Sequence, residues 1–136
     1  EDFHDVYNGA DLADRLVFTG YVDRQTLTAL LENARVLAIV SLMEGFGLPV
    51  LEAMAANVPV LSSNVSSLPE VAGDAAFYVD PLDVDSITKG LHRLLSDEAL
   101  RTDLTVRGVK RLNNFSWESA AQKTMDVFLA AVGKKP

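Results

Sequence analysis

The sequence contains no cysteine, no long apolar run and no excess of positive charge. Within these 136 residues there is therefore no disulfide, no thiolate-based zinc site and no thiol nucleophile. Apolar runs without a charge are short, so the chain offers no membrane-spanning helix. Lysine and arginine number 12 against 19 aspartates and glutamates, and the resulting net charge of −7 argues against a nucleic-acid-binding surface.

The composition is otherwise that of one globular domain. Hydrophobic residues make up 49% of the 136 positions, which is enough to bury a core. An acidic domain can still bind a phosphorylated small molecule, because the N-terminus of a helix supplies a local positive potential.

Short β-rich runs alternate with helical patterns along the chain. The runs that predict strands are residues 15–20, 35–41, 58–63 and 75–80. The segments that predict helices are 23–34, 49–57, 85–97, 98–114 and 116–133, with a short turn near 68–73. This alternation predicts a doubly wound parallel sheet. The last two helices follow the alternation, so we expect that they could pack on another domain.

The segment EGFGLPVLEAM, residues 44–54, combines two glycines, a proline and two glutamates with apolar residues, which a stable fold alone does not require. In an open parallel sheet, ligands bind beyond the carboxyl ends of the strands, and residues 35–41 lead to such an end. Gly45 and Gly47 let a backbone approach a ligand closely, and Pro49 suits the first turn of a helix. The free amides around Gly47 and Leu48 would then form an anion site.

Two carboxylates flank this segment, with seven residues between Glu44 and Glu52. A carboxylate accepts two hydrogen bonds at once, which suits vicinal hydroxyls on a sugar or ribose. Alternatively, Glu52 merely favours the helix dipole and Glu44 is a solvated loop residue. The spacing alone does not decide between these interpretations.

The stretch EGFGLPVLEAMA resembles the signature of the retaining glycosyltransferases of family four, which have the GT-B fold. The resemblance extends from RLVFTGYV through VPVLSSNVSSLPEVAGDAAFYVDP to FSWESAA. It implies an α/β fold, a Rossmann-like parallel sheet with flanking helices. On this expectation, residues 1–136 are a partial C-terminal nucleotide-sugar-binding domain, without its first strands and without the N-terminal acceptor domain.

The resemblance also implies roles for particular residues. Glu44 would be the catalytic residue that contacts hydroxyls of the transferred sugar, and Glu52 would bind the ribose hydroxyls. The backbone of Gly45, Phe46, Gly47 and Leu48 would bind hydroxyls and phosphates of the donor. Tyr21 and Val22 would line the nucleobase, although Tyr21 can equally be read as an ordinary exposed strand end.

The expected activity is transfer of a sugar from a nucleotide-sugar with retention of configuration and without an enzyme nucleophile. No cofactor and no metal are expected, because the nucleotide-sugar is a substrate. The acceptor would be a saccharide or a lipid-linked molecule bound by the N-terminal domain. The resemblance is compatible with a cytoplasmic enzyme, associated peripherally with the inner face of the membrane. SSNVSSLPEVAGDAA is most similar to mannosyltransferases of bacterial surface polysaccharides, which suggests GDP-mannose.

Two other functions remain open at this point. The chain could be a module that binds a nucleotide or nucleotide-sugar without turnover, or an interaction module with a vestigial glutamate pair. The intact glutamates and glycines of 44–52 count against the latter. Asp83 and Asp85 form an Asp-x-Asp sequence, a pattern that can bind a metal ion, but helix capping explains these two aspartates better.

Some positions depart from the family pattern. Asn57 stands where glycine is common after the helix, and asparagine tolerates the left-handed conformation. Ser66 and Ser67 replace frequent glycines, and Met43 replaces an aromatic residue.

The strand order of the family adds one structural prediction. A sheet of order 3-2-1-4-5-6 places two strands between residues 15–20 and residues 35–41, and both of these strands would precede residue 1. We therefore predict that residues 15–19 do not pair with residues 36–40 in one chain.

Overall fold

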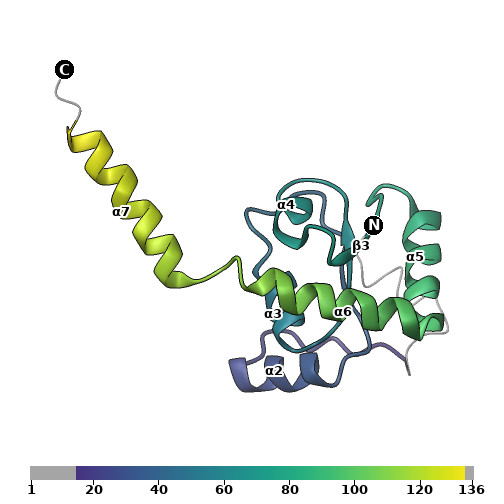
Figure 1. The fold of residues 1–136 in the computed structure, drawn as a ribbon. Coiled ribbons are helices and arrows are strands. Elements are labelled where there is room, and N and C mark those ends of the chain that lie inside the picture. The colour runs from purple at the N-terminus through teal and green to yellow at the C-terminus, as the bar shows by residue number, and fades with distance from the viewer. Residues whose placement is uncertain (1–14, 134–136) are drawn as a thin grey trace.

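The computed structural model describes residues 15–133, in which a parallel three-stranded sheet lies between helices (Figure 1). Its strands are β1 (Leu37–Ile39), β2 (Val60–Ser63) and β3 (Ala76–Val79), in that order across the sheet. The helices are α2 (Arg24–Glu32), α3 (Leu48–Ala55), α4 (Leu68–Ala72), α5 (Val84–Ser96), α6 (Glu98–Leu112) and α7 (Trp117–Gly133). The predicted parallel α/β architecture is confirmed.

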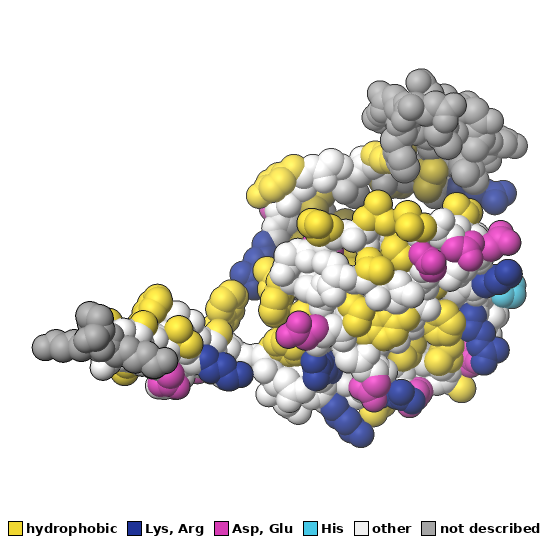
Figure 2. All heavy atoms as spheres, turned by 90° about the horizontal axis from the view of Figure 1, so that it is seen from above, with side chains coloured by type: hydrophobic (Ala, Val, Ile, Leu, Met, Phe, Trp, Pro, Cys, Tyr) yellow, Lys and Arg dark blue, Asp and Glu magenta, His cyan; other side chains and the backbone are white. Residues whose placement is uncertain are grey.

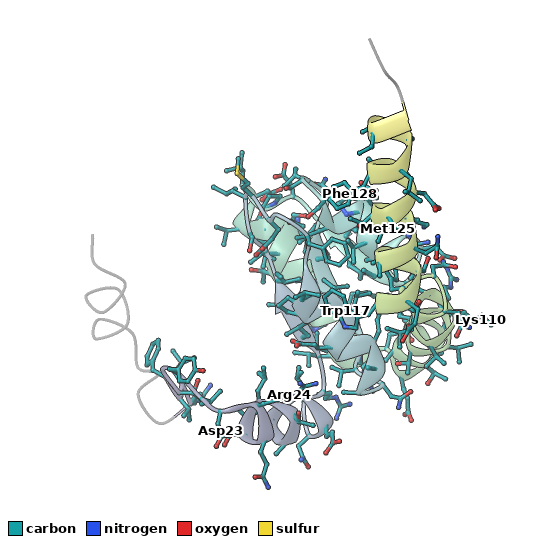
Figure 3. All side chains as sticks on the ribbon, turned by 90° about the vertical axis from the view of Figure 1, so that its left-hand side faces the viewer. Asp23, Arg24, Lys110, Trp117, Met125 and Phe128 are labelled. Carbon is teal, nitrogen blue, oxygen red and sulfur yellow. The ribbon has the colours of Figure 1, made fainter. Side chains whose placement is uncertain are left out.

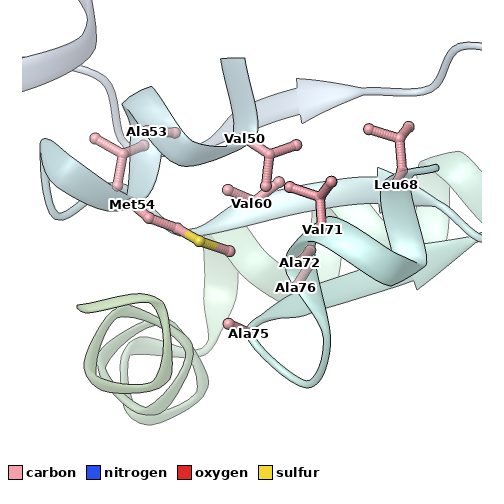
Figure 4. Packing of buried hydrophobic residues seen from close by; sticks show 10 residues of the cluster. Val50, Ala53, Met54, Val60, Leu68, Val71, Ala72, Ala75 and Ala76 are labelled. Carbon is pink, nitrogen blue, oxygen red and sulfur yellow. The ribbon is translucent and has the colours of Figure 1, made fainter. Parts of the chain in front are cut away.

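The central strand β2 joins the two halves of the core. Successive side chains of a strand point to opposite faces, so Val60 and Leu61 enter different hydrophobic clusters. The cluster around Val60 joins the sheet to α3 and α4 (Figure 4). The cluster around Leu61 joins it to α5 and α6. Burial on both faces explains why this strand reads as a continuous apolar run.

Short-range hydrogen bonds begin several helices where the sequence predicts them. Asp83 precedes α5 and accepts a hydrogen bond from the Asp85 amide at 2.9 Å, and Ser116 accepts one from the backbone three residues on at 3.0 Å. Capping by Asp83 is thereby confirmed, and Ser116 caps the helix predicted to begin there. Asp23 caps α2, and the hydrogen bond from the Thr26 amide lowers the pKa of its carboxyl group.

The strand predicted at residues 15–20 is wrong. These residues adopt no strand and are all exposed, Val17 to 86%. A strand forms where a neighbouring strand completes its hydrogen bonds, and the described sheet of β1, β2 and β3 does not include residues 15–20. Instead, β1 pairs with β2 from Leu37–Val60 to Ile39–Ser62. The prediction that residues 15–19 do not pair with 36–40 is therefore confirmed.

The expectation that the last two helices could pack on another domain is wrong for α6. This helix belongs to the core, since Leu104 is buried and Gly108 lies against α3. A Cβ added at Gly108 would lie 2.9 Å from Met54 Cγ, so the close helix contact requires glycine.

Helix α7 projects away from the rest of the described structure (Figure 1). None of its residues is buried, and hydrophobic side chains stand exposed along it (Figure 2). Trp117, Met125 and Phe128 are among them (Figure 3), and a helical period of 3.6 places them on neighbouring parts of one face. For α7, packing on another domain stays a prediction.

Candidate functional site

The segment 44–48 lies where the parallel sheet ends and α3 begins. It follows β1 at the carboxyl edge of the sheet, the edge at which open α/β sheets bind ligands. The loop that follows β2, residues 64–67, lies beside it and is joined to it by hydrogen bonds. Two consecutive loops therefore form the candidate site.

Glu44 is half-buried and held by a neighbour in its own loop. The Ser41 hydroxyl donates a hydrogen bond of 2.8 Å to Glu44 Oε1. The Ser63 hydroxyl donates one of 2.7 Å to the Ser41 carbonyl oxygen, which ties the end of β1 to the end of β2. The carboxylate is thus oriented by the chain yet remains partly accessible to a ligand.

Gly47 begins α3 in a conformation that favours glycine. Its φ of 104° and ψ of 43° are left-handed, and its side-chain position is closed, because an added Cβ would lie 2.7 Å from Leu68 Cδ2. Leu48 and Pro49 then form the first turn, as the sequence predicts. Pro49 has no N–H, and the Val50 amide donates a hydrogen bond of 3.0 Å to the Gly47 carbonyl oxygen. The amides of Gly47 and Leu48 are therefore the ones left to attract an anion.

Gly45 differs from Gly47. A Cβ added at Gly45 would meet no atom within 4 Å, and the backbone there is not left-handed. The fold therefore does not require glycine at this position. The open space is what a close approach by a ligand would need.

Phe46 packs on the C-terminal part of the chain. Its ring makes an edge-to-face contact with Phe115, with centroids 6.0 Å apart and planes at 87°. The Arg111 guanidinium lies 5.3 Å from the Phe115 centroid and donates hydrogen bonds to the carbonyl oxygens of Glu70 and Val71 at the end of α4. Sequence reasoning missed Arg111 and Phe115, and the only signal was the FSWESAA stretch that contains Phe115.

Glu52 lies apart from the hydrogen-bond network around Glu44. It is exposed on α3 and faces α2 across a hollow of about 230 Å³. The residues that line this hollow are Arg24, Leu27, Thr28, Leu31, Glu32, Glu52, Ala55 and Ala56. No residue in the range 15–133 donates a hydrogen bond to the Glu52 carboxylate, which is therefore open to a ligand.

Tyr21 and Val22 lie just before α2. Tyr21 is fully exposed and Val22 is half-buried. Their assignment to the nucleobase stays a prediction, since neither lines the hollow beside Glu52.

The described part of the chain has neither a cluster of metal-binding side chains nor a membrane-spanning helix. Among residues 15–133, no three His, Asp or Glu side chains are grouped so that they could hold a metal ion. No helix of the same residues has the length and apolar character needed to cross a membrane.

Comparison with known proteins gives consistent results. The family described as Glycosyl transferases group 1 matches residues 5–111. The chain is 44% identical over 111 residues to the O-antigen chain mannosyltransferase B of Escherichia coli, an alignment that covers 82% of this chain and 29% of that protein. It is 41% identical over 114 residues to the MMP alpha-(1->4)-mannosyltransferase of Mycolicibacterium hassiacum, with 81% and 28% covered. The chain thus spans less than a third of the length of these relatives.

Solved structures agree with the sequence relatives. Sucrose-phosphate synthase from Thermosynechococcus elongatus superposes with a TM-score of 0.84 at 28% identity, covering 96% of this chain and 33% of that one. The C-terminal domain of a group 1 glycosyl transferase from Francisella tularensis gives 0.71 at 27% identity, with 82% and 58% covered. The fold is the Rossmann-like fold of GT-B glycosyltransferases, and the chain belongs to the family of group 1 glycosyl transferases.

Proposed function

We propose that this chain is the donor-binding part of an enzyme that transfers a sugar from a nucleotide-sugar to a saccharide or lipid-linked acceptor. The observation that carries the proposal is the arrangement of Glu44 and the start of α3 at one edge of the sheet. There, a carboxylate oriented by Ser41 adjoins the amides of Gly47 and Leu48 at the start of α3. A hydroxyl-rich, diphosphate-bearing ligand has groups that match both.

In this proposal each part of the ligand has its own binding group. Glu44 contacts hydroxyls of the transferred sugar, and the backbone of 45–48 contacts the diphosphate. Glu52 binds the ribose hydroxyls from the wall of the hollow between α2 and α3, which supports a nucleoside position there. Tyr21 and Val22, just before α2, contact the nucleobase in this proposal.

The chemistry expected of the chain is positioning and charge stabilisation. As the sugar leaves, negative charge develops on the diphosphate, and the amides of Gly47 and Leu48 at the start of α3 stabilise it without having to reorganise. Reaction on one face of the sugar, without an enzyme nucleophile, would retain the configuration. We propose that the binding of donor requires no metal and no cofactor, so a chelator should leave nucleotide binding unchanged.

The donor is proposed to be GDP-mannose. The support is that relatives at 44% and 41% identity are named as mannosyltransferases. Titration of the full-length protein with GDP, UDP and ADP separates the nucleotides, and tighter binding of UDP or ADP than of GDP would contradict this choice.

The acceptor is proposed to bind outside this chain. The chain spans 29% of the length of its E. coli relative, and the apolar face of α7 is exposed. We propose that this face contacts the acceptor domain in a cytoplasmic protein that associates peripherally with the membrane. A non-catalytic nucleotide-binding module is the alternative, and it predicts nucleotide binding without transfer in the full-length protein.

Glu52→Ala tests the proposed site. The ribose hydroxyls lose a charged acceptor worth about 1.5–3 kcal/mol, so the affinity for the nucleoside diphosphate should fall by about one to two decades. Calorimetric titration of the full-length protein measures this affinity. Because the Glu52 carboxylate is exposed and has no partner in the described chain, the fold should be unaffected.

Glu32→Ala is the matched control. It removes the same charge from the opposite wall of the same hollow, and it should not weaken binding. Unchanged affinity in Glu52→Ala, or equal losses in the two variants, would remove Glu52 from the ribose site.

A further inference from the structure

Two serines in the loop after β2 hold the backbone of the loop that carries Glu44. The Ser66 hydroxyl accepts a hydrogen bond from the Glu44 amide at 3.1 Å and donates one to the Glu44 carbonyl oxygen at 2.8 Å. The Ser67 hydroxyl lies 2.9 Å from the carbonyl oxygens of both Glu44 and Phe46. Both polar groups of the Glu44 backbone are therefore satisfied by residues more than twenty positions later in the chain.

The backbone of Ser66 adopts an unusual conformation in the turn before α4. Its φ is +61°, a left-handed value that a residue with a Cβ rarely adopts. Among the described residues, only Asn57 is a second non-glycine residue with positive φ. Asparagine tolerates this conformation, and Asn57 stands at the end of α3 where it is common. At Ser66, the two hydrogen bonds to the Glu44 backbone offset the free-energy cost of the positive φ.

The Ser67 side chain does not cap the helix that follows it. It precedes α4, where a serine side chain usually accepts a hydrogen bond from the first turn of the helix. No such hydrogen bond is present, and the hydroxyl points instead to the loop of Glu44 and Phe46. The two serines thus serve the neighbouring loop rather than their own helix.

We propose that Ser66 and Ser67 are positioning residues that set the direction of the Glu44 carboxylate towards the donor sugar. Ser66 and Ser67 fix the backbone of Glu44, while Ser41 fixes its side chain at Oε1. This inference rests on the proposed function. It assigns a purpose to the hydroxyl groups of both serines.

Ser66→Gly separates positioning from folding. Glycine loses the two hydrogen bonds of the hydroxyl but relieves the left-handed φ. The two effects offset, so the variant should unfold close to the temperature of the wild type. In the full-length protein, kcat with the nucleotide-sugar should fall about tenfold, because Glu44 loses its fixed direction. Affinity for the nucleoside diphosphate should stay unchanged, because Glu52 and the α3 amides are untouched.

Two variants of Ser67 test whether the hydroxyl group itself is needed for kcat. Ser67→Ala removes the hydroxyl and should lower kcat, whereas Ser67→Thr keeps it at an ordinary φ of −77° and should retain kcat. Ser96→Ala is the control, because it removes a serine-to-backbone hydrogen bond at the exposed end of α5 and should change nothing. Hydrogen–deuterium exchange provides a readout that needs no turnover: the amide of Glu44 should exchange faster in Ser66→Gly.

The outcomes distinguish this inference from the proposed function. Wild-type kcat in Ser66→Gly, unchanged exchange at Glu44, or parallel losses of kcat, diphosphate affinity and thermal stability would overturn the positioning role. A full-length wild-type protein that binds nucleotide-sugar but transfers nothing would instead overturn the proposed function, and with it the catalytic purpose of the two serines. Even then, faster exchange of the Glu44 amide in Ser66→Gly than in the wild type would support the role of Ser66 in restraining the backbone of Glu44.

Discussion

Gly47→Ala is expected to destabilise the protein by about 2 to 5 kcal/mol. A left-handed φ costs a residue with a Cβ about 1–2 kcal/mol, and overpacking a filled site costs about 1–3 kcal/mol more. Both apply here, because φ is 104° and the new Cβ would lie 2.7 Å from Cδ2 of the fully buried Leu68. Denaturant unfolding of the full-length protein, followed by a probe of this domain, measures the loss.

The matched control is Gly45→Ala, two residues away in the same loop. Its Cβ would enter open space and its φ is not left-handed, so stability should change little. If Gly45 lies against the donor, the same variant should weaken binding of the nucleotide-sugar. Wild-type stability in Gly47→Ala would mean that Leu68 and the start of α3 rearrange without cost, contrary to the packing described.

Glu44→Gln is expected to lower kcat about tenfold to a hundredfold while leaving affinity for the nucleoside diphosphate nearly unchanged. Glutamine has the same shape, and its amide oxygen can still accept the hydrogen bond from Ser41, so the loop should keep its geometry. What is lost is the charge that faces the sugar, and a hydrogen bond to a charged group is worth about 1.5–3 kcal/mol.

Steady-state kinetics with the nucleotide-sugar and calorimetry with the nucleoside diphosphate together test this role. Glu98→Gln makes the same charge change at an exposed position at the start of α6 and should leave kcat unaltered, since Glu98 lies outside the site. Equal losses of kcat and diphosphate affinity in Glu44→Gln would show that Glu44 contributes uniform binding and would count against its assigned contact with the sugar.

The contacts that the sequence missed around the site are long-range. Ser66 and Glu44 are 22 residues apart, and Arg111 and Glu70 are 41 apart. No periodicity or spacing rule links such positions, because the folded sheet brings them together. Phe46 is an intermediate case: its place in the loop was predicted, but its contact with Phe115 was not.

The sequence by itself determined the features that depend on neighbours a few residues away. These are the alternation of strands and helices, the caps at Asp83 and Ser116, and the proline-led start of α3 after Gly47. Their physics is local, since an aspartate or serine caps a helix within three residues and a buried strand reads as an apolar run. Only the tertiary structure decided that residues 15–20 form no strand, that α6 belongs to the core and that Ser66 holds Glu44. Each of these depends on a partner distant in the chain, and a residue's own sequence surroundings do not specify that partner.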